Sequence, residues 1–239
     1  MILLEGVLEK YDIVYVLKNN LEIDELIYSL RSVVLNFPYN KIYFYGGSTC
    51  AIKPDVQIEY QQIGNTKAER VINTLVEVCK NDDITENFWL FNDDFYILNK
   101  VSDYTPMYDG RLPELASRIE SSRGKSSLYT DRVRKTNKWL LDNGYNNLNY
   151  CVHTPMLINR KQALPILKEF KDHNFRALYG NIYSIGGVDI KDVKIVKINE
   201  DIDKEINSVY LSTKEKSFNK GLVGKRIREM FLNRCKYEL

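Results

Sequence analysis

The chain has 239 residues, of which 44% are hydrophobic and 28% are charged. A chain of this length and composition can bury one sizeable core, which excludes wholesale disorder and predicts a single catalytic domain over residues 1–239. No apolar run approaches the ~20 residues of a membrane span, and the first residues lack the features of a signal peptide, so we expect a soluble, cytoplasmic protein. The four cysteines form no CxxC or Cys/His cluster, which argues against zinc sites and disulfides.

The formal net charge of +2 favours neither an anionic nor a neutral partner, but the basic residues are unevenly distributed. Residues 117–138 carry seven basic against two acidic side chains, and the tail from residue 212 onward carries eight against three. Such segregation suits phosphate-bearing ligands, although solvated helix faces carry the same charges. We therefore expect the basic residues around 132–138 and 214–236 to face the acceptor side of a cleft.

The first hundred residues alternate between strand and helix patterns. Short β-branched and aromatic runs predict strands, and apolar residues that recur every three or four positions predict helices. In chain order the patterns predict a strand over 11–17, a helix over 23–37, strands over 41–45 and 56–60, a helix over 66–80, and strands over 88–91 and 95–98. This order indicates an α/β fold with a mainly parallel sheet flanked by helices. Ligands of such sheets bind at the carboxyl ends of the strands.

The remainder of the chain is more helical. The patterns predict helices over 113–122, 126–143 and 160–172, a short helix before Gly186, strands over 150–158 and 188–198, and a terminal helix over 217–235. The chain thus divides near residues 100 and 211, and residues 212–239 form a basic, helical C-terminal part.

Two adjacent carboxylates, Asp93 and Asp94, follow directly after the uniformly apolar run 88–91. A buried pair of like charges is costly without a counter-charge, which a divalent cation supplies. Mg²⁺ or Mn²⁺ accepts one or two protein carboxylates and completes its coordination with water and phosphate oxygens. The pair therefore predicts a metal site in which Asp94 is the direct ligand. The alternative is a plain polar turn between two strands.

Several segments resemble the Stealth proteins, which are hexose-1-phosphate transferases of capsular polysaccharide and related pathways. The similarity lies in residues 11–15 (YDIVY), 25–33 (ELIYSLRSV), 41–43 (KIY), 91–95 (FNDDF) and the His153-Thr154-Pro155 element. The chain departs from the Stealth pattern in its length and in the segment after Tyr45. The resemblance implies transfer of a sugar phosphate from a nucleotide sugar.

The same features are similar to those of GT-A nucleotide-sugar glycosyltransferases, in which an acidic motif after a central strand holds the metal and the diphosphate. This resemblance implies a GT-A-like fold, with a nucleotide-sugar-binding half over residues 1–100 and an acceptor half over residues 101–211. A compact chain of this kind also resembles phage-encoded sugar transferases, including those that decorate modified DNA bases. Such an origin would place the protein in the host cytoplasm.

Four further residues are candidates for the site. His153 follows a predicted strand, where its imidazole suits phosphate binding or acid/base chemistry, although a hydrogen-bonded structural histidine is the alternative. Arg176 and Asn181 flank Gly180 and could hold sugar hydroxyls or phosphate, while a surface ion pair is the other interpretation of Arg176. The family resemblance implies that Arg31 contacts the diphosphate, whereas its helical surroundings also fit a structural salt bridge.

These observations favour a metal-dependent glycosyltransferase that uses Mn²⁺ or Mg²⁺ and a nucleotide-sugar donor, with a glycan or a modified DNA base as acceptor. In this hypothesis Asp94 and His153 are the catalytic residues, and Asp93 with Arg31, Arg176 and Asn181 bind the donor. The alternative keeps the donor but transfers a sugar phosphate. A hypothesis of another class is a non-catalytic nucleic-acid-binding module, motivated by the two basic segments.

Overall fold

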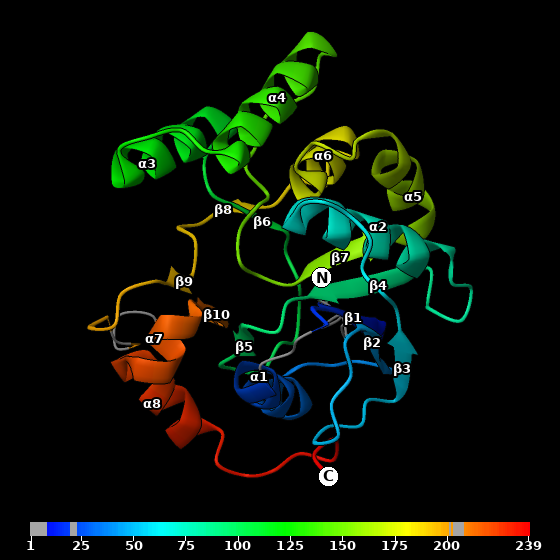
Figure 1. Ribbon diagram of the computed structural model, residues 1–239, viewed down its shortest axis with the longest axis vertical. Coiled ribbons are helices and arrows are strands. Elements are labelled where there is room, and N and C mark those ends of the chain that lie inside the picture. The colour runs from blue at the N-terminus through cyan, green and yellow to red at the C-terminus, as the bar shows by residue number, and fades with distance from the viewer. Residues whose placement is uncertain (1–8, 20–22, 201, 203–207) are drawn as a thin grey trace, which may run out of the picture.

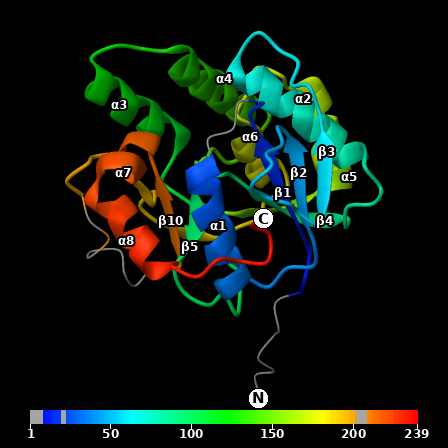
Figure 2. The ribbon, with the colours of Figure 1, turned by 60° about the horizontal axis from the view of Figure 1, so that its bottom comes forward.

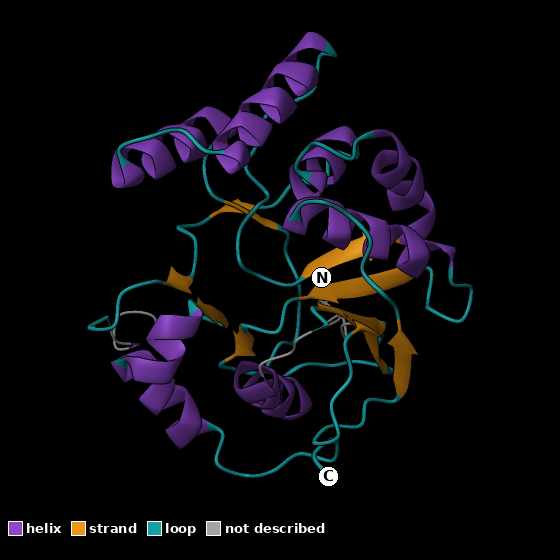
Figure 3. Cartoon of the chain, viewed as in Figure 1, coloured by secondary structure: helices purple, strands orange, loops and turns teal. Residues whose placement is uncertain are grey.

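The computed structural model describes residues 9–19, 23–200, 202 and 208–239. Its centre is a five-stranded sheet in which the first four strands along the chain run parallel and the last is antiparallel (Figures 1 and 3). In spatial order the strands are β3 (Val56–Glu59), β2 (Ile42–Gly46), β1 (Asp12–Leu17), β4 (Asn87–Phe91) and β7 (Met156–Asn159). The parallel part of the sheet thus brings the ends of β1 and β4 to the same edge.

Helices cover both faces of this sheet (Figure 1). One face packs against α1 (Ile23–Asn36), and the other packs against α2 (Lys67–Lys80), α5 (Arg160–Glu169) and α6 (Phe175–Ile182). Successive residues of β4 alternate between the two cores, because neighbouring side chains of a strand point to opposite faces. Both sets are apolar, which explains why β4 reads as an uninterrupted hydrophobic run.

A smaller sheet joins distant parts of the chain. It consists of β5 (Phe95–Ile97), β10 (Tyr210–Thr213) and β9 (Lys194–Ile195), with β10 antiparallel to β5 and parallel to β9. The helices α7 (Glu215–Lys220) and α8 (Leu222–Met230) pack on it through a separate core that includes Tyr96 and Phe218. Because β5 follows the turn after β4, this small sheet lies next to the carboxyl edge of the large one.

The remaining elements form the part of the molecule opposite α1 in Figure 1. They are β6 (Met107–Tyr108), α3 (Leu112–Arg123), α4 (Leu128–Asp142) and β8 (Val188–Asp189). The two short strands pair in parallel, and α3 and α4 pack against each other as a helical hairpin. After α8 the chain runs back past α1 and ends beside the loop that precedes β3, where the amide of Leu239 donates to the carbonyl of Ala51 (Figure 2).

The fold class predicted from the sequence is confirmed, since the structure is α/β with a mainly parallel sheet, flanking helices and a helical C-terminal part. Three predicted elements differ from the structure. Of the strand expected over 150–158, only the last part forms, as β7, and residues 150–155 form a loop. The strand expected over 188–198 is divided between β8 and β9, which pair with different partners.

The single terminal helix predicted over 217–235 is wrong. The structure has the separate helices α7 and α8, joined at Gly221, whose extended backbone ends one helix and begins the next. At Gly221 a Cβ atom would lie 2.4 Å from the carbonyl oxygen of Ser217 and 2.9 Å from that of Ile198, so the chain approaches itself closely there. Within the described residues no helix has the length and apolar character needed to cross a membrane.

Candidate functional site

The predicted acidic pair lies in the turn between β4 and β5, at the carboxyl edge of the central sheet. The amide of Phe95 donates to the carbonyl oxygen of Asn92 at 3.3 Å and so closes the turn that carries Asp93 and Asp94. The turn is buried on its flanks by Phe91 and Phe95, each at most 1% exposed. The pair therefore lies where ligands of parallel α/β sheets bind.

The two carboxylate oxygens of Asp94 have different surroundings. Oδ2 accepts hydrogen bonds from Lys194 Nζ at 2.7 Å and from Ser212 Oγ at 3.1 Å. Oδ1 is buried and accepts no hydrogen bond from any described residue. A buried carboxylate oxygen without a partner is costly, so this atom is a candidate for a ligand that the protein alone does not provide.

Two more carboxyl groups experience the same environment. Burial raises the pKa of Asp93, and repulsion by Asp94 raises it further, while Lys18 and Lys67 act in the opposite direction. Glu25, in the first turn of α1, accepts a hydrogen bond from Thr213 Oγ1 at 2.7 Å. Burial raises the pKa of Glu25 to about 7, and the charges of Asp94 and Asp93 contribute. The site therefore concentrates negative charge that a bound cation would neutralise.

His153 forms a dyad with Asp192. The ring Nδ1 lies 2.7 Å from Asp192 Oδ2, and the backbone amide of His153 donates to Asp192 Oδ1 at 2.9 Å. Burial would raise the pKa of Asp192, but the hydrogen bond and the charge of His153 outweigh it and hold that pKa below its ordinary value. With Nδ1 engaged by the carboxylate, Nε2 is the ring atom able to accept or donate a proton.

One segment connects the dyad to the acidic pair. Asp192, the partner of His153, is two residues before Lys194, the partner of Asp94. The carbonyl of Val193 between them accepts from the amide of Ser212, so this stretch is held beside β10. The charge of Lys194 also contributes to the lowered pKa of Asp192. The acidic pair and His153 are therefore linked through this short segment.

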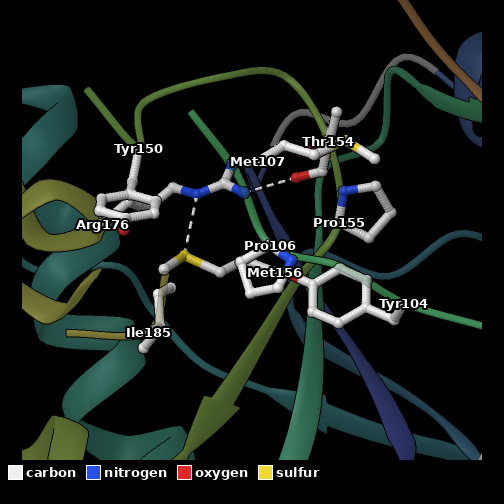
Figure 4. Close-up of a pocket in the computed structure, with 9 residues that line it drawn as sticks. All are labelled: Tyr104, Pro106, Met107, Tyr150, Thr154, Pro155, Met156, Arg176 and Ile185. Carbon is white, nitrogen blue, oxygen red and sulfur yellow. Dashed lines mark hydrogen bonds between the residues drawn. The ribbon is translucent and has the colours of Figure 1, made fainter. Parts of the chain in front are cut away.

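Arg176 contacts the backbone of the loop that carries Thr154 and Pro155 (Figure 4). Its guanidinium donates to the carbonyl oxygens of Val152 and Thr154, the residues on either side of His153, and Nε lies 3.4 Å from Met156 Sδ. These contacts form one wall of a recess that Tyr104 and other side chains complete. Arg176 thus holds the backbone on both sides of His153, and its role in donor binding stays a prediction.

Asn181 and Arg31, which were expected to bind the donor, both have hydrogen-bond partners within the fold. The buried amide of Asn181 bonds to the backbone of Leu148 on both its donor and acceptor sides, at 2.9 Å each. Arg31 makes a two-pronged ion pair with Glu238 at 2.8 and 2.7 Å and also donates to the carbonyl of Phe231 at 2.9 Å. Because the guanidinium of Arg31 is held by Glu238 and by Phe231, the geometry favours the structural salt bridge for this residue.

The sequence patterns did not identify three residues of the site, Lys194, Asp192 and Glu25. Asp192 and Lys194 alternate within the strand-like run after Gly187, and such alternation predicts one polar face but not what faces it. Glu25 is an acidic residue in the first turn of a helix, where the helix dipole alone explains its presence. The structure shows that Lys194 pairs with Asp94, that Asp192 pairs with His153, and that Glu25 accepts a hydrogen bond from Thr213, the residue after Ser212.

No protein-family model matches the chain, and no curated protein matches it. Among solved structures, the galactosyltransferase LgtC, determined with donor and acceptor sugar analogs, shares 11% identity over 94% of this chain and 96% of its own, with a TM-score of 0.49. GlyE, a glycosyltransferase of Streptococcus pneumoniae, shares 10% identity over 94% of this chain and 61% of its own, with a TM-score of 0.48. A glycosyltransferase involved in glycosylation of the major capsid of PBCV-1 shares 12% identity over 92% and 100%, with a TM-score of 0.39. The function is therefore inferred from this chain's own residues.

Proposed function

We propose that this protein is a glycosyltransferase that transfers a sugar from a nucleotide-sugar donor to a hydroxyl-bearing acceptor, with Asp93 and Asp94 as ligands of Mn²⁺ or Mg²⁺. The observation that carries the proposal is the buried Oδ1 of Asp94, at the carboxyl edge of the parallel sheet, which has no hydrogen-bond partner among the residues that the structure describes. The GT-A-like resemblance of the acidic motif supports the same donor class. Residues 1–100 would then form the donor-binding half and residues 101–211 the acceptor half.

The residues present fit a divalent cation of this kind. Carboxylate oxygens are the ligands that Mg²⁺ and Mn²⁺ prefer, and Asp94 Oδ1 is available for that role. The described residues contain no group of three or more His, Cys, Asp and Glu side chains that could hold a metal. A cation bound through one or two carboxylates and the donor's phosphate oxygens needs no such group.

Each residue of the site has a role in this proposal. When bound, the cation would neutralise the charge that develops on the departing diphosphate. Lys194 and Lys18 add positive charge beside the acidic turn. His153, oriented through Nδ1 by Asp192, takes the proton of the acceptor hydroxyl on Nε2. Arg176 holds the backbone on both sides of His153.

A panel of nucleotide sugars with Mn²⁺ tests the proposal, because a bound donor raises the thermal unfolding temperature. The donor that gives a shift is then incubated with candidate glycan acceptors, and the released nucleotide is identified. A nucleoside diphosphate supports glycosyl transfer, and a nucleoside monophosphate supports the sugar-phosphate alternative. The absence of any shift with all donors would contradict both.

The basic segments give little support to a nucleic-acid acceptor. On α4, Arg134 pairs with Glu120 of α3, and Lys135 pairs with Asp172 at 2.9 Å. On α8, Lys225 lies 3.8 Å from Glu229. Because these cations have acidic partners within the fold, we propose a carbohydrate acceptor before DNA.

The proposed metal ligand makes a specific prediction. Asp94→Asn is nearly isosteric but removes the ligand charge, so it should abolish divalent-dependent donor binding and lower turnover at least about 100-fold. Asp131→Asn, on the exposed surface of α4, is the matched control and should behave as the wild type. Wild-type turnover in Asp94→Asn, measured with saturating Mn²⁺, would contradict the assignment.

A further inference from the structure

Lys194 provides the acidic turn with a cation of its own. Its Nζ lies 2.7 Å from Asp94 Oδ2, and the two side chains are only 24% and 13% exposed. An ion pair with this little exposure is screened weakly, so the charge of Lys194 acts strongly on anything else that binds Asp94. The proposed metal site therefore already contains a competing positive charge.

The backbone beneath Lys194 is fixed by the small sheet. Ser212 is the register partner of Phe95 on β5 and also of Lys194 on β9. These pairings align Lys194 with the residue that directly follows Asp94, and Ser212 Oγ bonds to the same carboxylate oxygen. The ammonium group can leave Asp94 by rotation of its side chain, but the strand that carries it is held in place.

Two cations on one carboxylate repel each other. The two oxygens of a carboxylate are close together, so a divalent ion on Oδ1 of Asp94 would lie within a few ångströms of the Lys194 ammonium on Oδ2, where repulsion is substantial. A diphosphate changes this balance, because its oxygens accept hydrogen bonds from an ammonium group and also ligate the metal. Lys194 would then exchange Asp94 for the diphosphate.

We propose that Lys194 competes with the divalent cation for Asp94, so that the site takes up metal together with a diphosphate-bearing ligand and only weakly without one. This inference rests on the metal site of the proposed function. In the free protein Lys194 neutralises Asp94 and so weakens metal binding. When the donor binds, Lys194 moves to the diphosphate and Asp94 becomes available to the metal.

Calorimetric titration of Mn²⁺ into the protein, with no phosphate present, tests the competition. Lys194→Met removes the charge while keeping a side chain of similar length, and it should bind Mn²⁺ at least about tenfold more tightly than the wild type. Lys194→Arg keeps the charge and should bind Mn²⁺ as the wild type does. The matched control is Lys197→Met on the same segment, since Lys197 pairs with the exposed Glu200 and should have no effect.

Thermal unfolding with pyrophosphate as the probe tests the coupling. The wild type should gain a larger shift from Mn²⁺ and pyrophosphate together than from the sum of the two alone, whereas Lys194→Met should gain a shift from Mn²⁺ alone. Circular dichroism of each variant establishes that it folds. The double variant Lys194→Met, Asp94→Asn should lose the added Mn²⁺ affinity, which assigns that affinity to Asp94.

The outcomes separate this inference from the proposed function. Equal Mn²⁺ affinity in Lys194→Met and the wild type overturns the competition, even where glycosyl transfer is observed. Retention of the added affinity in the double variant overturns it as well. Tighter Mn²⁺ binding in Lys194→Met supports the competition, and if the wild type at the same time shows no glycosyl transfer from any donor, that result counts against the proposed function alone.

Discussion

Individual polar residues of the site are held so that one atom of each stays available for chemistry. Asp94 is held through Oδ2 by Lys194 and Ser212, which leaves Oδ1 without a hydrogen bond from any described residue. His153 is held through Nδ1 by Asp192, which leaves Nε2 as the proton-transfer atom. In both cases a neighbour fixes the orientation of the side chain, and such orientation is what catalytic groups need.

The orientation of His153 can be tested separately from donor binding. Asp192→Asn removes the charge that holds Nδ1 but not the side-chain volume, so kcat should fall about 10- to 100-fold while KM for the donor changes little. Steady-state kinetics with varied donor and acceptor measure the two constants. Glu200→Gln, further along the same segment, is the control and should leave both unchanged. A rise in donor KM with unchanged kcat would assign Asp192 to binding instead.

At the scale of secondary-structure elements, a glycine inside α8 sets how closely α7 and α8 pack. Gly224 lies in α8 against α7, and a Cβ atom there would lie 1.7 Å from the carbonyl oxygen of Phe218. Backbone atoms cannot yield as a flexible side chain can, so the two helices can pack this closely only with glycine at this position.

Gly224→Ala should therefore lower the free energy of unfolding by about 2 kcal/mol or more, because the helices must separate to admit the methyl group. Urea unfolding followed by circular dichroism measures the change. Lys225→Ala, the next residue and exposed, is the matched control and should stay within about 0.5 kcal/mol of the wild type. Equal stability of Gly224→Ala and the wild type would show that α7 and α8 can shift without cost.

The strands of the central sheet could be predicted from the sequence. The elements of the C-terminal part could be predicted only in part. β1, β2 and β4 are buried on both faces, and short apolar runs of this kind are hard to interpret in any other way. The break at Gly221 depends on a close approach to Ile198, which no local pattern encodes. The site could likewise be predicted only in part. The position of Asp94 follows from β4, but Lys194 is brought to Asp94 by the pairing of β9 with β10, which no local sequence pattern shows.

At the scale of the whole molecule, the end of the chain ties α1 to the body of the protein. Glu238 forms an isolated bridge with Ile52 and accepts the two-pronged hydrogen bond of Arg31. Tyr237 nearby donates to Asp55 Oδ2 at 2.6 Å. These contacts join residues about two hundred positions apart. The last residues therefore stabilise the position of α1, whose first turn carries Glu25.

The ion pair of Arg31 and Glu238 should make stability depend on pH in a defined direction. The hydrogen bonds and charge of Arg31 lower the pKa of Glu238 to about 2, and the Glu238 side chain is only 6% exposed. A carboxyl group whose pKa is depressed by folding stabilises the protein above its unfolded pKa, near 4.3, and loses this contribution as the pH falls through its folded pKa.

Glu238→Gln should therefore lower the free energy of unfolding by about 2 kcal/mol at pH 7, and the difference from the wild type should shrink between about pH 4 and pH 2. Urea unfolding at pH 7, 4 and 3 measures it. Glu77→Gln breaks an exposed ion pair with Lys80 and should cost less than about 0.5 kcal/mol. If the loss of unfolding free energy in Glu238→Gln stays constant down to pH 3, the loss comes from poor packing of the carboxamide and not from the missing charge. The pH dependence of the wild type would then come from other carboxyl groups.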